Sequence, residues 1–233
     1  MRMLPSADEW GRGECRGKSA SGETQVTMET AAVRLCPQCG HPASSAESQC
    51  RACDTPFVTA SLSILAQIGD QKVRSWQSFY KQHGDDPACG FLVGMCFLKL
   101  RQPDFALKSL EKTLEAMPEN PEIYYHMAVA SIGLKKPKLL TRAGALKVEQ
   151  YLNTAVQLDE RQSKYHLLLG VVKHDFYELN GLRSTDPKYA DCISTALTVG
   201  NYQDDEVRQM AGLVPVTDAT LAVLSHSGIS YGI

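Results

Sequence analysis

The chain has 233 residues, of which 43% are hydrophobic and 21% are charged, and its formal charge at pH 7 is −2. This composition is typical of a soluble globular protein and excludes an intrinsically disordered one. The near-neutral charge disfavours a dedicated nucleic-acid binder. No apolar run reaches the roughly 18 residues that cross a bilayer, so no membrane span is expected.

Residues 1–34 are predicted to form a disordered lead. They are rich in Gly, Ser, Glu and Arg and show no hydrophobic period. The basic residues near the start have no apolar core between them, so no signal peptide is expected and a reducing cytoplasm is the predicted location. Met28 lies eight residues before Cys36, so translation could begin there instead of at Met1.

Residues 35–58 are predicted to form a zinc ribbon, because they contain two Cys-x-x-Cys pairs separated by ten residues. The four candidate ligands are Cys36, Cys39, Cys50 and Cys53. Tetrahedral Zn²⁺ binds four thiolates at about 2.3 Å, and the gap of two residues lets both sulfurs of a pair face one ion. Four cysteines leave no open coordination position, so the expected role of the zinc is structural.

This segment resembles the small zinc ribbon at the N-terminus of many bacterial proteins, although Asp54 stands where the second knuckle usually has Gly. The ribbon carries little positive charge. Between Cys36 and Phe57 there are one Arg, no Lys and two acids, whereas phosphate binding needs several cations on one face. We therefore interpret the ribbon as a metal-stapled module, with redox chemistry of its thiolates as the alternative.

From about residue 60 onward the pattern is helical. Apolar residues recur at spacings of three and four, and Pro and Gly mark the joints. The pattern also repeats, since residues 109–114 and 121–125 align with 151–156 and 163–167 at an offset of 42. Such a repeat indicates stacked pairs of helices.

The unit at 87–120 resembles the tetratricopeptide repeat (TPR), a pair of antiparallel helices in about 34 residues. Counted from Pro87, positions eight and twenty hold Gly94 and Ala106, small residues that let the two helices approach closely. Gly90 stands at position four, where the family has a bulky residue. The resemblance implies an all-α, TPR-like helical-hairpin solenoid, preceded by the zinc ribbon.

The solenoid is expected to span residues 61–226. Its units are predicted near 61–84, 87–120, 121–162 and 163–202, followed by closing helices at 203–226 and a frayed tail at 227–233. Two of the units carry insertions, one around Lys135 to Ala143 and one around Asn180 to Pro187. Asn-Gly and Asp-Pro pairs mark the second insertion as a loop.

By the same resemblance, four positions on the first helix of each unit line a concave groove that binds partners. The candidate groove residues are Phe91, Met95, Leu98, Tyr125, Val129, Ile132, Leu167 and Val171. Such an apolar groove suits a hydrophobic or amphipathic helix of a partner protein. The alternative is filling from within, because apolar patches of that size are unusual on monomers. The C-terminal segment supplies the candidates Leu213, Val214, Val216, Leu221, Val223 and Leu224.

We expect a non-enzymatic protein–protein interaction adaptor or scaffold that uses the groove, with the zinc ribbon as a second contact surface. The chain has no Gly-rich phosphate loop, no Gly-x-Ser-x-Gly and no His-Glu-x-x-His motif. One alternative is a nucleic-acid-associated factor that uses the ribbon and a basic run, and another is a redox-switched zinc chaperone. The basic run, whose usual meaning is a solvated surface, comprises Lys135, Lys136, Lys138, Arg142 and Lys147.

Overall fold

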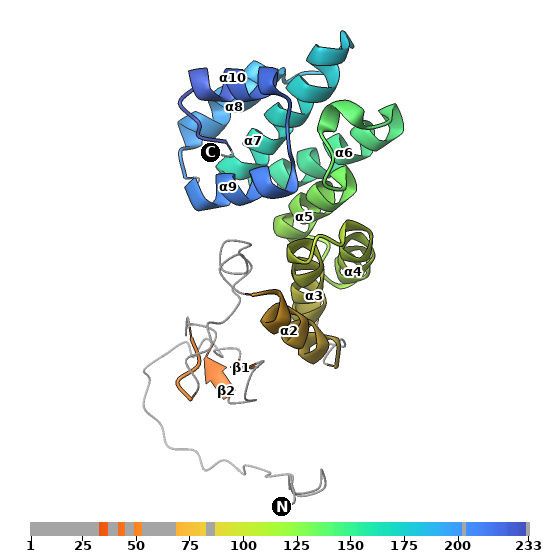
Figure 1. Ribbon diagram of the computed structural model, residues 1–233, viewed down its shortest axis with the longest axis vertical. Helices are drawn as coiled ribbons and strands as arrows, with labels where there is room; N and C mark the ends of the chain where they lie inside the picture. The colour runs from red at the N-terminus through yellow and green to blue at the C-terminus, as the bar shows by residue number, and fades with distance from the viewer. Residues whose placement is uncertain are drawn as a thin grey trace, which may run out of the picture.

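The computed structural model describes residues 33–36, 42–44, 49–52, 69–82, 87–201 and 204–231. Figure 1 shows these residues as a stack of helical hairpins together with a small two-stranded sheet. The predicted all-α, TPR-like class of fold is confirmed by this stack. Residues 1–32, the larger part of the predicted lead, lie outside the described residues.

The small sheet consists of β1 (Val33–Leu35) and β2 (Pro42–Ser44). The strands pair antiparallel, with Val33 opposite Ser44 and Leu35 opposite Pro42. Strand β1 therefore begins within the last residues of the predicted lead and ends immediately before Cys36.

The helices follow in chain order. The first three are α2 (Asp70–Gln82), α3 (Pro87–Lys99) and α4 (Pro103–Ala116). The next pair is α5 (Pro121–Ile132) and α6 (Arg142–Leu158), with the 3₁₀ turn η1 (Pro137–Leu139) between them. Then come α7 (Ser163–Val172), the π-helical turn η2 (Lys173–Tyr177), the 3₁₀ turn η3 (Glu178–Asn180) and α8 (Tyr189–Val199). The last two are α9 (Asp204–Leu213) and α10 (Asp218–His226).

Proline and glycine fix many of the helix ends. Pro87, Pro103 and Pro121 are the first residues of their helices, where the missing N–H breaks no hydrogen bond. Gly133 and Gly200 follow α5 and α8 with φ of 68° and 65°, a left-handed conformation that glycine adopts without steric cost. These residues divide the helical part of the chain into hairpins.

Glycine also brings the two helices of a hairpin together. A Cβ on Gly94 of α3 would lie 2.8 Å from the side chain of Leu110 of α4. A Cβ on Gly170 of α7 would lie 2.9 Å from Ile193 of α8. Because real Cβ atoms almost never approach so closely, these positions accept no larger residue, and the hairpins α3–α4 and α7–α8 depend on them for their spacing.

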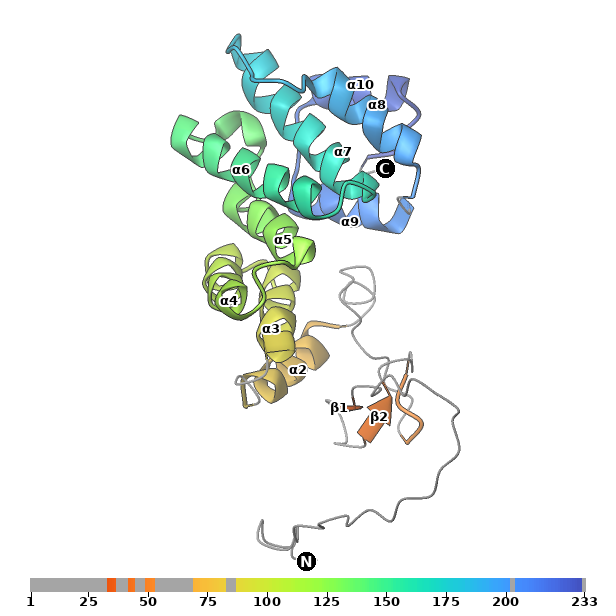
Figure 2. The same ribbon diagram turned by 180° about the vertical axis from the view of Figure 1, so that it is seen from behind.

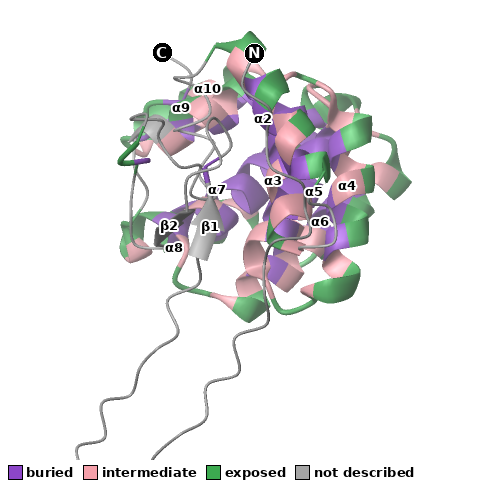
Figure 3. Ribbon diagram, turned by 90° about the horizontal axis from the view of Figure 1, so that it is seen from below, coloured by how far each residue is buried: buried purple, intermediate pink, exposed green. Residues whose placement is uncertain are grey.

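The first helix of each hairpin lies inside the molecule. Figures 1 and 2 show α4 and α6 on one side of α3 and α5, with α9 and α10 on the other side. Figure 3 shows buried residues gathered on α3, α5 and α7. A single apolar cluster runs through all three helices and includes residues of α9 and α10.

Candidate partner-binding face

The predicted groove residues lie together on α3, α5 and α7, and we call the surface that they form the inner face. All eight are buried, and the largest exposed fraction among them is 6%, at Phe91. These side chains therefore do not line an open groove. Their role in binding a partner stays a prediction.

The inner face is covered by α9. At its N-terminal end, Glu206 lies 3.8 Å from the ammonium group of Lys164 on α7. At its C-terminal end, Gly212 accepts a hydrogen bond of 3.4 Å through its carbonyl from Arg101, which follows α3. Helix α9 thus reaches from the third hairpin to the first, and its buried Val207 and Met210 join the common apolar cluster.

The rest of the C-terminal segment completes this cover. Leu213, Val214, Val216 and Leu224 are buried, and Leu221 and Val223 pack against the cluster partly buried. Of the two alternatives that the sequence left open, filling from within is the arrangement among the described residues. The physical reason is that the apolar side chains of this segment and of the inner face are removed from water together when they pack against each other.

The predicted frayed tail is wrong for the part of it that the structure describes. Ile229 and Tyr231 are 1% and 3% exposed. The hydroxyl of Tyr231 donates to the carbonyl of Val214 at 2.8 Å. Ile229 and Tyr231 belong to the apolar cluster that includes the inner face. On that face, burial and then the negative charge of Glu122 raise the pKa of Tyr125.

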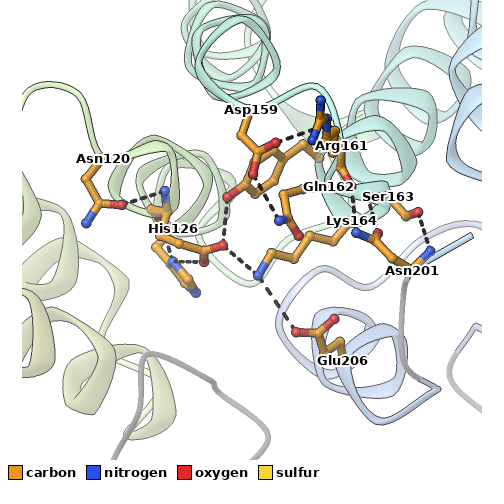
Figure 4. Close-up of polar contacts among 11 residues, drawn as sticks. Asn120, His126, Asp159, Arg161, Gln162, Ser163, Lys164, Asn201 and Glu206 are labelled. Carbon is orange, nitrogen blue, oxygen red and sulfur yellow. Dashed lines mark hydrogen bonds and ion pairs between the residues drawn. The ribbon is translucent and has the colours of Figure 1, made fainter. Parts of the chain in front are cut away.

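A polar cluster borders the inner face, and Figure 4 shows its contacts. One carboxylate oxygen of Glu122 accepts from the hydroxyl of Tyr165 and from the ammonium of Lys164, both at 2.7 Å. Lys164 also lies over the rings of Tyr125 and Tyr165, 5.5 and 5.7 Å from their centroids. Burial alone would raise the pKa of Glu122, but the electrostatic effects of His126 and Lys164 and the hydrogen bonds from Lys164 and Tyr165 outweigh it, and the pKa is lowered.

This cluster was not among the predicted site residues, although the sequence contains a signal for it. Glu122 and Lys164 occupy position two of successive units, at the repeat offset of 42 residues. Opposite charges at equivalent positions of stacked repeats meet across the joint between units. With 22% and 16% of their side chains exposed, both remain in reach of a binding partner.

His126 ties this cluster to the apolar inner face. Its Nδ1 donates to the carbonyl of Glu122 at 2.7 Å, and its ring makes edge contacts with Phe91 and Tyr125. The residue is only 2% exposed. Burial lowers the pKa of His126 to about 4, although Glu122 acts in the opposite direction.

We expect the free energy of unfolding to decrease as the pH is lowered from 6.5 towards 4. Between these values His126 is neutral in the folded protein but protonated in the unfolded chain, so unfolding takes up a proton. The contribution of this residue is about 2–3 kcal/mol over the whole range. Burial also lowers the pKa of His174, so this residue adds a pH dependence of stability in the same direction.

Urea unfolding between pH 5 and 7.5 measures this dependence. His126→Gln keeps a hydrogen-bond donor and removes the titration, so its free energy of unfolding should depend less on pH than that of the wild type. His226→Gln, at an exposed site, is the control and should leave the dependence unchanged. An unaltered dependence in His126→Gln would show that the pKa of His126 is the same in the folded and the unfolded protein.

The predicted metal ligands are described only in part. Cys36 and Cys50 are buried, and the sulfur of Cys50 accepts a hydrogen bond of 3.4 Å from the amide of Ala52. Cys39 and Cys53 lie outside the described residues. In the part of the chain that the structure describes, no three side chains of the metal-binding types come together. The zinc site therefore stays a prediction.

No protein-family model matches the chain, and no curated protein matches it. Nine chains of solved structures are similar to it in fold. One of them, titled "MamA RS-1 ArsTM double mutant", has a TM-score of 0.43 and 19% sequence identity, over 61% of this chain and 76% of that chain. The arrangement of its own helices defines this chain as an all-α, TPR-like helical-hairpin protein. None of its described helices is both long and apolar enough to cross a membrane.

Proposed function

We propose that this chain is a non-enzymatic adaptor that binds another protein through the inner face of its solenoid. The observation that carries the proposal is that α9 already lies on this face, between Lys164 and Arg101. A face that accommodates one amphipathic helix has the apolar centre and the charged border that a second such helix requires. In this proposal α9 is the resident occupant, and a partner helix takes its place.

The chemistry of the buried polar groups supports an adaptor and not an enzyme. The buried carboxylate of Asp175 accepts hydrogen bonds from Lys138, Thr217 and Thr220, and the buried ammonium of Lys173 pairs with Glu149. Each of these groups joins segments that are distant in the sequence. Because the polar atoms of these groups are occupied by hydrogen bonds and ion pairs, the groups hold the backbone in position and are not available to react with a substrate.

A structural zinc ion in the ribbon would supply a second contact surface. The observations that support it are the buried sulfurs of Cys36 and Cys50 and the amide hydrogen bond to the latter, since such bonds orient a thiolate ligand. Cys39 and Cys53 would complete the set. Bound zinc would hold together a module that is too small for an apolar core. The zinc content of the purified chain, expected at about one ion per chain, tests this part of the proposal.

The double variant Val207→Asp/Met210→Asp tests the role of the inner face. Both residues lie on the buried side of α9, so two carboxylates there should release the helix while α3 to α8 keep their own packing. Faster amide hydrogen exchange at residues 204–213 verifies the release. Ala222→Asp, on the exposed side of α10, is the control.

Native affinity purification then compares the wild type, the double variant and the control. We expect one defined protein at a near-equal amount, with at least threefold more of it bound to the double variant because its inner face is open. The control should bind as the wild type does. Equal binding by all three would place the partner elsewhere, and nucleic acid without a protein partner would support the alternative of a nucleic-acid-associated factor.

A further inference from the structure

The two insertions of the solenoid lie side by side, although they belong to different units. The side-chain amide of Asn180 donates to the carbonyl of Lys138 at 3.3 Å, which joins the second insertion to η1. Thr185 donates to Glu149 of α6 at 3.0 Å. Leu182 and Arg183, between these two anchors, are therefore held beside η1 and the first part of α6.

Positive charge gathers where the insertions meet. Five exposed cations lie on these segments, and none forms an ion pair with another described residue. They are Lys135, Lys136, Lys138, Arg142 and Arg183. The amide of Leu182 donates to the carbonyl of Tyr177 at 2.8 Å and Asn180 donates to Lys138, so Arg183 lies in the same region as the cations of the first insertion. In a chain of net charge −2, this is a local positive field.

Exposed leucines lie among these cations. Leu139, Leu146 and Leu182 are 70%, 51% and 44% exposed, and they are three of the six large apolar residues exposed in the described part of the chain. Figures 1 and 2 place the segment around η3 and the start of α6 on the side of the molecule away from α9. We call the five cations and three leucines the insert surface.

The chemistry of the insert surface selects its partner. Nucleic-acid binding would use exposed aromatic side chains for stacking, and a membrane interface favours Trp and Tyr. The aromatic residues beneath this surface, Phe176 and Tyr177, are 3% and 7% exposed. Cations interspersed with leucines instead match a chain segment that offers both carboxylates and apolar side chains. We infer that the insert surface binds an acidic amphipathic segment of a partner protein, at a site separate from the inner face.

A fluorescein-labelled helical peptide of 18 residues, with Leu at spacings of three and four and Glu elsewhere, probes this surface on the full-length chain. We expect binding that weakens as salt is added, and at least tenfold weaker binding of a peptide in which Ser replaces every Leu. Vesicles of phosphatidylserine and phosphatidylcholine and a single-stranded RNA serve as competitors. Displacement of the peptide by either at a lower concentration than unlabelled peptide would overturn the inference.

Variants at exposed positions localise the binding without disturbing the fold. Leu139→Ser/Leu182→Ser and Lys136→Glu/Lys138→Glu should each weaken peptide binding at least fivefold. Leu197→Ser and Lys112→Glu are the matched controls at exposed sites elsewhere and should have no effect. Unchanged binding in the first two variants would overturn the inference. The Val207→Asp/Met210→Asp variant should bind the peptide normally, and increased binding there would assign the peptide to the inner face.

Discussion

Replacing Asp175 with alanine is expected to lower the free energy of unfolding by about 3–5 kcal/mol. This carboxylate is fully buried in η2 and accepts four hydrogen bonds. One oxygen accepts from the amide of Lys138 at 2.9 Å, and the other accepts from the amide and hydroxyl of Thr217 and from the hydroxyl of Thr220. Alanine would leave the amides of Lys138 and Thr217 without this acceptor.

The loss of stability should act mainly at α10 and at the first insertion. Because Thr217 caps α10 and Lys138 belongs to η1, both the last helix and the first insertion lose an anchor. Urea unfolding measures the loss of stability, and amide hydrogen exchange at Lys138 and Thr217 shows where it acts. Glu178→Ala, at an exposed site three residues further on, should change stability by less than about 0.5 kcal/mol. A similarly small effect of Asp175→Ala would mean that water replaces the carboxylate.

Replacing Lys173 with methionine is expected to cost about 3–5 kcal/mol, because it leaves a carboxylate buried without its cation. The ammonium of Lys173, 1% exposed, lies 2.5 Å from Glu149, which is 5% exposed. Glu149 also accepts from Tyr177 at 2.8 Å and from Thr185 at 3.0 Å. Burial raises the pKa of Glu149, but the hydrogen bonds from Lys173 and Tyr177 outweigh it, and the pKa is lowered.

The pH dependence of stability identifies the cause of this loss. In the wild type the lowered pKa of Glu149 contributes stability above the unfolded value of 4.5, and that stability is lost as the pH falls. In Lys173→Met burial is no longer offset, so the pKa of Glu149 rises in the folded state and stability should decrease with rising pH. Lys173→Met/Glu149→Gln removes the buried charge, keeps an acceptor for Tyr177 and should recover most of the loss. If the double variant recovers no stability, the loss in Lys173→Met comes from the packing of the Lys173 side chain and not from the buried charge.

Much of the fold follows from local pattern in the sequence. The apolar spacing and the offset of 42 predicted stacked helical hairpins, and prolines at 87, 103 and 121 begin helices because their missing N–H is tolerated only there. Gly94 and Gly170 mark where paired helices approach most closely. The apolar character of the inner face was also predictable, because apolar residues recur at equivalent positions of the first helix in successive units.

The sequence offered two covers for that face, the C-terminal segment and a partner helix, and could not decide between them, because an apolar stripe determines that a surface is buried and not which segment buries it. The ion pair between Lys164 and Glu206 and the hydrogen bond from Arg101 to Gly212 are what place α9 there. The same limit explains why Glu122 was not recognised as part of a polar cluster, since its bonds to Tyr165 and Lys164 form only when two units stack.

The amino-acid pattern alone was enough to predict the class of fold and the repeat, because helical spacing depends on residues within one or two turns and the repeat is the same local pattern 42 residues further on. The occupation of the inner face by the C-terminal segment and the shared surface of the two insertions follow instead from how the helices pack. Both depend on hydrogen bonds across long separations, such as those from Thr217 to Asp175, 42 residues away, and from Asn180 to Lys138, also 42 residues away. The repeat alone does not show which polar residues form such bonds, because this depends on which groups packing brings together.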